Sequence, residues 1–224
     1  MSSDQIFNLA IQIVVFLFAI SVHESAHAWT ASRYGDPTAR MLGRVSLNPI
    51  RHIDPVGTVI MPLICYISHI PLIGWAKPTP VNPLNFRKNY VMADIMTSVA
   101  GPVSNFIVAT LAVLLMAAIS WMFPEARNIL RYGMESQSSL MPLMILLYSA
   151  MQINVLLAVF NLIPIPPLDG SHVIRHMLSE SARNVYDRVG WIGLILFFLV
   201  GGSVLHVMMA PFLSFFSFLL RILV

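Results

Sequence analysis

The stretch that decides the fold is IFNLAIQIVVFLFAISVHESAH, residues 6–27, in which an apolar run passes directly into the HExxH motif of residues 23–27. On an α-helix His23 and His27 lie one turn apart on the same face, so two neutral imidazoles can bind one Zn²⁺. Glu24 can then take a proton from a zinc-bound water. Ionisable groups at membrane depth are costly, and their presence indicates function. The stretch predicts a metalloprotease whose zinc lies in or near the bilayer. The alternative is a pair of histidines satisfied by other buried polar groups.

The composition is that of an integral membrane protein. Hydrophobic residues make up 57% of the 224 residues and charged residues 10%, whereas a soluble domain carries about 25% charged residues. The net charge of +3 comes without a basic tract, so we expect no nucleic-acid partner. The single cysteine, Cys65, excludes an intrachain disulfide and a cysteine-rich zinc site. The N-terminus lacks a basic region and a cleavage signal, so we expect the first helix to be retained.

Five apolar runs are candidates for membrane segments, because a helix needs about 20 apolar residues to cross a bilayer. They lie at about 6–32, 56–76, 91–123, 140–163 and 189–220. The polar stretches between them are 33–54, 77–90, 124–139 and 164–188. The stretches 33–54, 77–90 and 164–188 each hold three or four lysines and arginines, whereas 124–139 holds only Arg127 and Arg131, offset by Glu125 and Glu135. The positive-inside rule therefore places that stretch outside the cell and the other three in the cytoplasm.

The run at 56–76 cannot cross the membrane if the stretches on both sides of it are cytoplasmic. We therefore expect it to dip into the bilayer and return, which Pro62, Pro71 and Gly74 would permit. The alternative is a run that spans fully. The short stretch at 43–47 has the pattern of a strand followed by a turn.

The predicted fold is an all-α polytopic membrane protein with about four transmembrane helices, a re-entrant segment and a short β element. We expect one membrane-embedded protease domain over residues 1–224, with a catalytic core at about 6–178 and a C-terminal helical region at about 187–224. The run at 189–220 is too long for a simple span. It could be one bent helix or a helix followed by a surface segment.

Two histidines leave a catalytic zinc one protein ligand short. The predicted topology brings the end of the helix at 140–163 to the same membrane side as the HExxH motif. Prolines break that helix, and Asp169 follows them, just before Gly170. Asp169 is therefore the expected third ligand. The alternative is that Asp169 caps the short helix that follows it.

Three stretches resemble the site-2 protease family of intramembrane zinc metalloproteases. They are HESAH at 23–27, AGPVSN at 100–105 and NLIPIPPLDG at 161–170, the last being similar to the family's Asn-x-x-Pro-x-x-x-x-Asp-Gly. With no inserted PDZ domain, the chain looks like a compact prokaryotic-type member. The resemblance implies one Zn²⁺ per chain and cleavage of peptide bonds in or near transmembrane segments of membrane-protein substrates, commonly in regulated proteolysis.

The resemblance also implies roles for individual residues. His23, His27 and Asp169 would be the zinc ligands, and Glu24 the general base. Asn161 matches the asparagine that holds the scissile carbonyl or its oxyanion; the alternative is a helix–helix hydrogen bond. Asn105 would pack helices or position substrate.

A helical substrate must be unwound before water can attack its backbone. Extended segments can do this by strand addition, and we expect residues 43–47 and 77–82, with Val45 and Val81, to bind substrate in this way. The predicted setting is the cell membrane and its lipid bilayer, with the active site toward the cytoplasm; the oligomeric state is left open. Two other functions fit the residues: a membrane HExxH protease of another family acting on non-transmembrane substrates, and a non-catalytic zinc-binding membrane protein.

Overall fold

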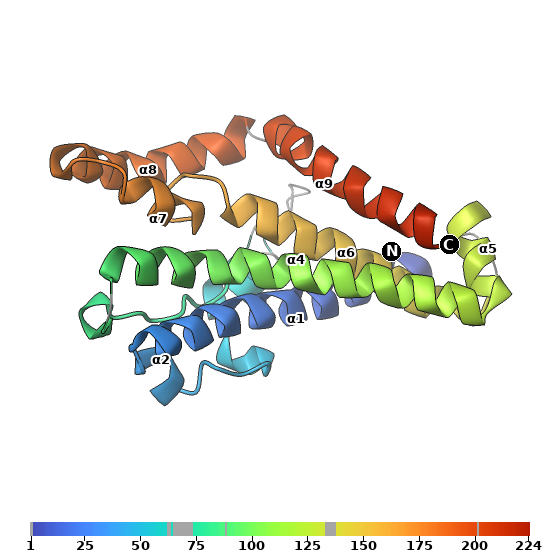
Figure 1. Cartoon of the computed structure of the whole chain (residues 1–224). Coiled ribbons are helices and arrows are strands. Elements are labelled where there is room, and N and C mark those ends of the chain that lie inside the picture. Colours follow the sequence, from blue (N-terminus) through green and yellow to red (C-terminus); the bar gives the residue numbers. More distant parts are fainter. Residues whose placement is uncertain (1, 62–63, 65–73, 88, 133–137, 201) are drawn as a thin grey trace. The chain divides into compact units, whose positions relative to one another are not determined.

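The computed structural model describes residues 2–61, 64, 74–87, 89–132, 138–200 and 202–224. The long helices are α1 (Ser3–Tyr34), α4 (Tyr90–Met122), α6 (Met141–Asn161), α8 (Glu180–Val200) and α9 (Gly202–Leu223). Shorter ones are α2 (Thr38–Met41), α5 (Pro124–Tyr132) and α7 (Gly170–Arg175). Single helical turns lie at η1 (Pro49–Arg51), η2 (Pro55–Ile60) and η3 (Pro83–Asn85). Figure 1 shows the helices in sequence colours.

Four helical segments in the described residues are long and apolar enough to cross a membrane: Gln5–Tyr34, Tyr90–Met122, Met141–Asn161 and Val204–Leu223. The first three match predicted runs. The fourth corresponds to the later part of the predicted run at 189–220, which the structure divides between α8 and α9. An all-α, multi-pass membrane protein is therefore confirmed.

The β element predicted at residues 43–47 is not confirmed, and no part of the chain that the structure describes is a β-strand. The reason lies at the end of α2. Gly43 takes a left-handed φ of 69°, and the Arg44 N–H donates to the Ala39 carbonyl oxygen at 2.9 Å. This pairing closes the helix with a tight turn. The chain then continues as an irregular segment that leads to η1.

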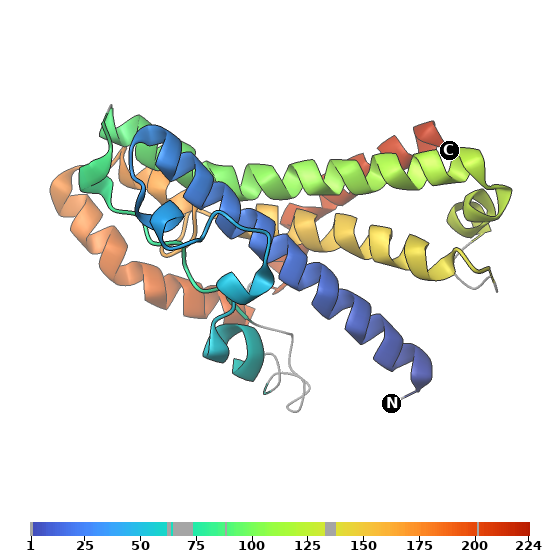
Figure 2. The same ribbon diagram turned by 90° about the horizontal axis from the view of Figure 1, so that it is seen from below.

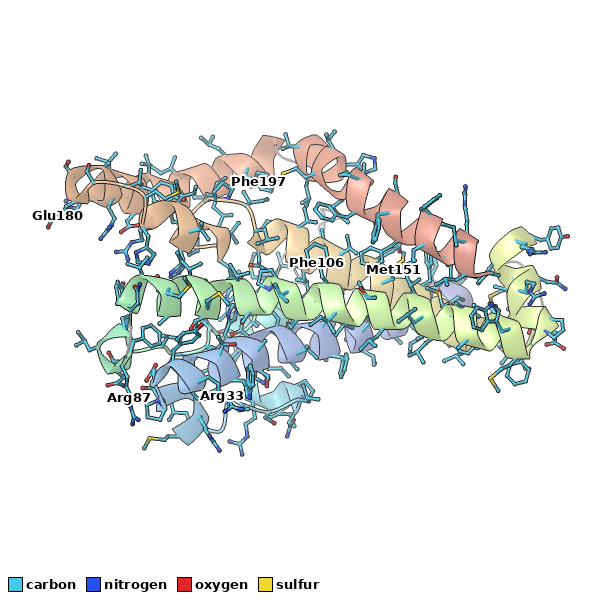
Figure 3. The ribbon with its side chains drawn as sticks, in the orientation of Figure 1. Arg33, Arg87, Phe106, Met151, Glu180 and Phe197 are labelled. Atoms are coloured by element: carbon cyan, nitrogen blue, oxygen red, sulfur yellow. The ribbon has the colours of Figure 1, made fainter. Side chains whose placement is uncertain are left out.

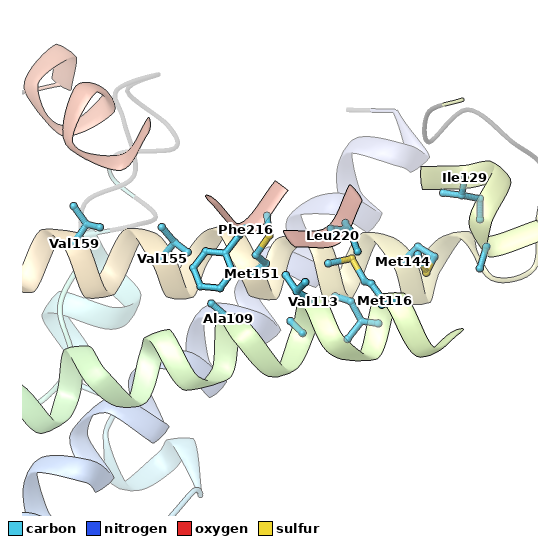
Figure 4. Close-up of a cluster of buried hydrophobic side chains, with 14 residues drawn as sticks. Ala109, Val113, Met116, Ile129, Met144, Met151, Val155, Val159, Phe216 and Leu220 are labelled. Carbon is cyan, nitrogen blue, oxygen red and sulfur yellow. The ribbon is translucent and has the colours of Figure 1, made fainter. Parts of the chain in front are cut away.

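The chain folds as two compact units. We call residues 20–101 the motif unit, and residues 1–19 with 102–224 the bundle unit. In the bundle unit α6 packs against α5 and α9, and α8 packs against α9. Figure 1 labels these helices, and Figure 2 gives the same ribbon seen from below. A hydrophobic core joins α4, α5, α6 and α9 around Met116, Met144, Met151 and Phe216 (Figure 4).

A carboxylate holds the connecting segments of the motif unit together. Asp36, fully buried just after α1, accepts hydrogen bonds from the Asn82 N–H at 2.7 Å and the Asn85 side-chain amide at 2.8 Å. Burial raises the pKa of Asp36, but bonds from Asn85, Thr38 and Asn82 outweigh it and hold the pKa below its ordinary value. The Arg87 N–H also donates to the Tyr34 carbonyl at 3.1 Å. Figure 3 labels Arg87, and Arg33 near the end of α1.

Most of the predicted re-entrant segment at 56–76 lies outside the described residues, but both of its ends are described. The Trp75 N–H donates to the Gly57 carbonyl at 3.1 Å, and the Lys77 N–H donates to the His52 carbonyl at 2.8 Å. The Thr58 hydroxyl donates to the Trp75 carbonyl at 2.8 Å. The chain therefore returns, at residues 75–77, to the place that it left at residues 52–58.

Candidate metal centre and catalytic residues

The two histidines of the motif lie on one face of α1, as the one-turn spacing requires. The side chains of His23 and His27 are buried, and their ring centroids lie 4.7 Å apart with the planes at 82°. Buried imidazoles of this kind need polar partners or a metal. Both belong to the motif unit, together with the first part of α4.

Gly101 of α4 shows where the two imidazoles converge. A Cβ atom built at this position would overlap Nε2 of both His23 and His27. The two nitrogens therefore lie against the same small patch of α4 backbone. Two ring nitrogens that meet at one point can bind the same ion. Glycine is needed here because a methyl group would fill this space.

Thr97 fixes which nitrogen of His27 can bind a metal. Its main-chain carbonyl oxygen lies 2.7 Å from His27 Nδ1, and a carbonyl can only accept, so Nδ1 carries the proton. Nε2, on the opposite side of the ring, is then the nitrogen with a lone pair. Metal-binding histidines commonly donate their other N–H to a carbonyl, which fixes both tautomer and ring orientation. His23 and His27 thus fit the requirements of a zinc site.

Glu24 is held by the proline-rich segment before η3. The Thr79 N–H donates to Glu24 Oε2 at 2.9 Å, and the Thr79 hydroxyl lies 2.7 Å from the same oxygen. That hydroxyl also lies 3.0 Å from the Glu24 carbonyl oxygen. The carboxylate is therefore oriented by a residue more than 50 positions away in the sequence.

Arg44 holds the same segment through main-chain carbonyl oxygens. Its side chain is buried, and its guanidinium donates to the carbonyl oxygens of Arg51, Lys77 and Pro78. Burial lowers the pKa of Arg44, while the negative charge of Glu24 acts in the opposite direction. A guanidinium remains protonated in proteins, so Arg44 contributes a buried positive charge on the Glu24 side of the motif unit.

His52 is neutral in this setting. It is fully buried, and burial lowers its pKa, which the bond to the Ser46 carbonyl only partly offsets. Its Nε2 lies 2.7 Å from that carbonyl oxygen and so carries the proton. We assign it to the packing of the connecting segments, whose Lys77 N–H bonds to the His52 carbonyl.

Asp169 lies in the bundle unit, directly before α7. It occupies the N-cap position, but its side chain makes no capping hydrogen bond. The sequence left open that the Asp169 side chain caps the short helix that follows it, and this alternative is therefore wrong. Gly170 lies so close to the Leu162 main chain that a Cβ would overlap it. The turn at 164–169 is braced by α8, where the Tyr186 hydroxyl donates to the Pro164 carbonyl at 2.8 Å.

Asn161 and Asn105 also lie in the bundle unit. Asn161 is the last residue of α6, and its amide donates to the Leu157 carbonyl of the same helix at 2.9 Å. Asn105 is fully buried in α4. Its amide donates to Asn154 Oδ1 at 2.8 Å and to the Ala19 carbonyl at 3.3 Å, a bonding pattern typical of helix packing.

Val45 and Val81 both lie in irregular segments of the motif unit. Val45 is 38% exposed, and Val81 is half-buried next to Asn82. Their segments meet through Arg44, which bonds to the carbonyl oxygens of Lys77 and Pro78. The substrate-binding role of these valines stays a prediction.

Residues 11–201 match the model of peptidase family M50. The chain belongs to this family. It is 34% identical to "Putative zinc metalloprotease YwhC" of Bacillus subtilis (strain 168) over 83% of this chain and 77% of that protein. It is 28% identical to "Putative zinc metalloprotease Rip2" of Mycolicibacterium smegmatis over 80% of this chain and 62% of that protein. No solved structure matches the chain significantly.

Membership of family M50 confirms the resemblance to site-2 proteases and the prediction of a Zn²⁺ cofactor. It also removes the alternative of an HExxH protease from another family. The motif residues of this M50 member fit the ion that the family implies, because Nε2 of both His23 and His27 converge at Gly101.

Sequence reasoning missed four contributors to the site: Arg44, Thr79, Thr97 and Gly101. Thr97 acts through its main chain, which no side-chain pattern reveals. Gly101 belongs to the stretch AGPVSN, but its steric role depends on which side chains pack against it in the fold. Arg44 is one of four arginines in the basic stretch 33–54, which indicates membrane topology only. The position of Thr79 between two prolines was a sequence signal. Because Pro78 and Pro80 have no N–H and fix the backbone, the N–H of Thr79 is the one donor of this tripeptide and can bind a specific partner.

Proposed function

We propose that this M50 peptidase is a zinc-dependent intramembrane endopeptidase that hydrolyses peptide bonds in or near the transmembrane segments of membrane-protein substrates, in regulated proteolysis. The observation that carries the proposal is the convergence of His23 and His27 Nε2 at Gly101, beside an oriented Glu24. This arrangement lies on a helix long and apolar enough to cross a membrane.

The proposed ligand set is two imidazoles and one carboxylate, from His23, His27 and Asp169, each of which offers one ligand atom. Three protein ligands leave a position for water or substrate, as catalytic zinc sites require. When bound, Zn²⁺ would polarise the scissile carbonyl and make water acidic at neutral pH. The place of Asp169 in the stretch NLIPIPPLDG, which resembles the family's Asn-x-x-Pro-x-x-x-x-Asp-Gly, supports its assignment as a ligand.

Glu24 acts as the general base in this proposal. One of its carboxylate oxygens takes a proton from the attacking water, whose oxygen forms the new bond to the carbonyl carbon. The same proton then passes to the leaving amide nitrogen as the C–N bond breaks. The Asn161 amide would donate to the carbonyl oxygen as negative charge develops on it.

The active site is proposed to face the cytoplasm. Hydrogen bonds join the basic stretches 33–54 and 77–90, including Asn82 to Asp36 and Lys77 to His52. Two stretches that bond to each other lie on the same membrane side, and both are rich in arginine and lysine. The pairing of Trp75 with Gly57 likewise supports a segment at 56–76 that enters and leaves on that side.

Substrate is proposed to add as a strand to the irregular segments of the motif unit around Val45 and Val81. A segment without internal helix or strand pairing has main-chain groups to offer to an unwound substrate. In residues 77–83 the prolines keep the backbone extended. The whole chain would act as a single protease domain within the bilayer, with the bundle unit presenting its helices to lipid.

The test of the proposed substrate class is a comparison of membrane-protein fragments in cells that carry wild type or Glu24→Gln. We expect wild-type cells to accumulate fragments whose new ends map in or near transmembrane segments, and Glu24→Gln cells to lack them. Wild-type-dependent fragments with ends only in soluble regions would overturn the intramembrane part of the proposal.

A further inference from the structure

The HExxH motif alone leaves the orientation of the Glu24 carboxylate unexplained. A glutamate side chain on a helix surface has three rotatable bonds, and ordering it costs up to about 2 kcal/mol. In this structure the Thr79 N–H donates to Oε2 at 2.9 Å, and the Thr79 hydroxyl lies 2.7 Å from the same oxygen, nearer than the Glu24 carbonyl oxygen at 3.0 Å. Within the described residues, no hydrogen bond reaches Oε1.

This asymmetry gives the two carboxylate oxygens of Glu24 different roles. An oxygen that already accepts two hydrogen bonds is a poor proton acceptor, whereas its partner keeps its lone pairs available. Oε1 is then the atom that takes the proton from water and returns it to the leaving nitrogen. With Oε2 anchored, Oε1 points in a fixed direction without reorganisation during the reaction.

Thr79 is itself held rigidly. Pro78 and Pro80 fix their own φ angles and restrict the residues before them, so the segment has few conformations to lose. Arg44 donates to the carbonyl oxygens of Lys77 and Pro78, directly before Thr79. Both Arg44 and Thr79 belong to the same compact unit as Glu24.

We propose that Thr79 is a positioning residue for the general base: held by Arg44 and two flanking prolines, it anchors Oε2 of Glu24 so that Oε1 is left to carry the proton. This inference rests on the proposed function. It adds that correct placement of the base depends on a loop residue far from the motif in sequence. Arg44 acts through Thr79 and makes no bond to Glu24 itself.

A purely structural role for Thr79 makes different predictions. If its bonds served only to tie the segment at 77–83 to α1, their loss would lower yield and stability, and folded molecules would turn over normally. A positioning role instead lowers kcat in molecules that are folded and metal-loaded. KM should change little, because the Thr79 hydroxyl lies against Glu24 and its loss leaves the main chain that the segment offers to substrate intact.

The experiment measures kcat, KM and zinc per chain for purified protein in detergent micelles, with a quenched fluorescent peptide carrying one transmembrane segment. Thr79→Val removes the hydroxyl at nearly constant shape. We expect kcat to fall about 10–100-fold, the usual range for groups that orient catalytic residues, with KM and zinc within about twofold of wild type. Thr79→Ser restores the hydroxyl and should recover most of the loss.

A matched control makes the result specific. Thr110→Val removes a hydroxyl that bonds to the Phe106 carbonyl of its own helix. This variant should leave kcat unchanged, because Thr110 makes no described bond to Glu24 or to the segment at 77–83.

The two proposals can fail separately. If wild type and Glu24→Gln cleave the peptide equally, the proposed function is wrong and this inference falls with it. If Glu24→Gln abolishes cleavage while Thr79→Val keeps wild-type kcat, the positioning role alone is overturned. A loss of kcat in Thr79→Val that Thr79→Ser does not recover would also overturn it.

Discussion

His27 Nδ1 lies 2.7 Å from the carbonyl oxygen of Thr97, and this contact joins α1 to α4 within the motif unit. The contact settles the tautomer of His27 and points Nε2 toward Gly101. A helix carbonyl ordinarily accepts from the N–H four residues later, and the Thr97 oxygen also accepts from the candidate metal ligand His27. The packing of two helices thus orients a residue of the candidate metal site.

Gly101→Ala should lose zinc. The added methyl group would occupy the place where Nε2 of His23 and His27 converge, so we expect at least a tenfold loss in zinc affinity. Metal analysis of purified protein in buffers of fixed free zinc measures this. Gly193→Ala is the matched control, because its Cβ would lie at an ordinary 3.5 Å from the nearest atom. Undiminished affinity in Gly101→Ala would show that the converging nitrogens do not bind the ion.

Alanine at His23, His27 or Asp169 should lower the zinc content of purified protein sharply from a value near one per chain. Each substitution removes one of three ligands and with it much of the binding free energy. Asp187→Ala is the control for a lost carboxylate. Asp187 of α8 forms an ion pair with Arg175 of α7 and is not a proposed zinc ligand. Full zinc occupancy in Asp169→Ala would remove Asp169 from the ligand set.

Single cysteines should show that both ends of the segment at 56–76 are cytoplasmic. In a Cys65→Ser background, Ile50→Cys and Leu84→Cys place thiols at positions that are 76% and 93% exposed. Both should resist an impermeant thiol reagent added outside intact cells, whereas Tyr132→Cys, at a position 84% exposed, should react. Labelling at position 84 from outside would mean that 56–76 crosses the membrane.

Much of the fold could be predicted from hydropathy, because each span must be apolar over about 20 residues whatever it packs against. The helices at Gln5–Tyr34, Tyr90–Met122 and Met141–Asn161 follow from this constraint. The ends of elements depend on tertiary contacts and are less predictable. The strand expected at 43–47 is replaced by a turn, because Gly43 and Arg44 close α2. The pattern of apolar and polar residues does not reveal this helix end.

The candidate site was predictable where chemistry demands particular side chains at fixed spacing, as at His23, Glu24 and His27. It was not predictable where the main chain or a distant loop contributes. The Thr97 carbonyl has no sequence signal, and the contact of Thr79 with Glu24 joins residues separated by 55 positions. The Asn105–Asn154 bond likewise has no sequence signal, because either amide alone fits a packing role or a substrate role.

Asn161→Ala should lower kcat more than substrate binding or zinc content. A donor that acts on developing oxyanion charge costs on the order of 10²–10³-fold in kcat when removed. Asn154→Ala is the contrasting variant, because its amide packs buried against Asn105. There we expect a loss of stability of about 0.6–1.7 kcal/mol, as for other interhelical bonds in membranes, with normal turnover per folded molecule. Normal turnover of zinc-loaded Asn161→Ala would reassign Asn161 to helix packing.

The central claim is that Glu24 is the base of a zinc-dependent peptide hydrolysis, and the turnover of zinc-loaded Glu24→Gln tests it most directly. Glutamine is nearly isosteric and can still accept the Thr79 bonds through its carbonyl oxygen, but it cannot take up a proton from water. We predict about one zinc per chain, an unchanged melting temperature and no measurable cleavage of the transmembrane peptide that wild type cleaves. Chelator-sensitive cleavage by Glu24→Gln at a rate near that of wild type would contradict the account.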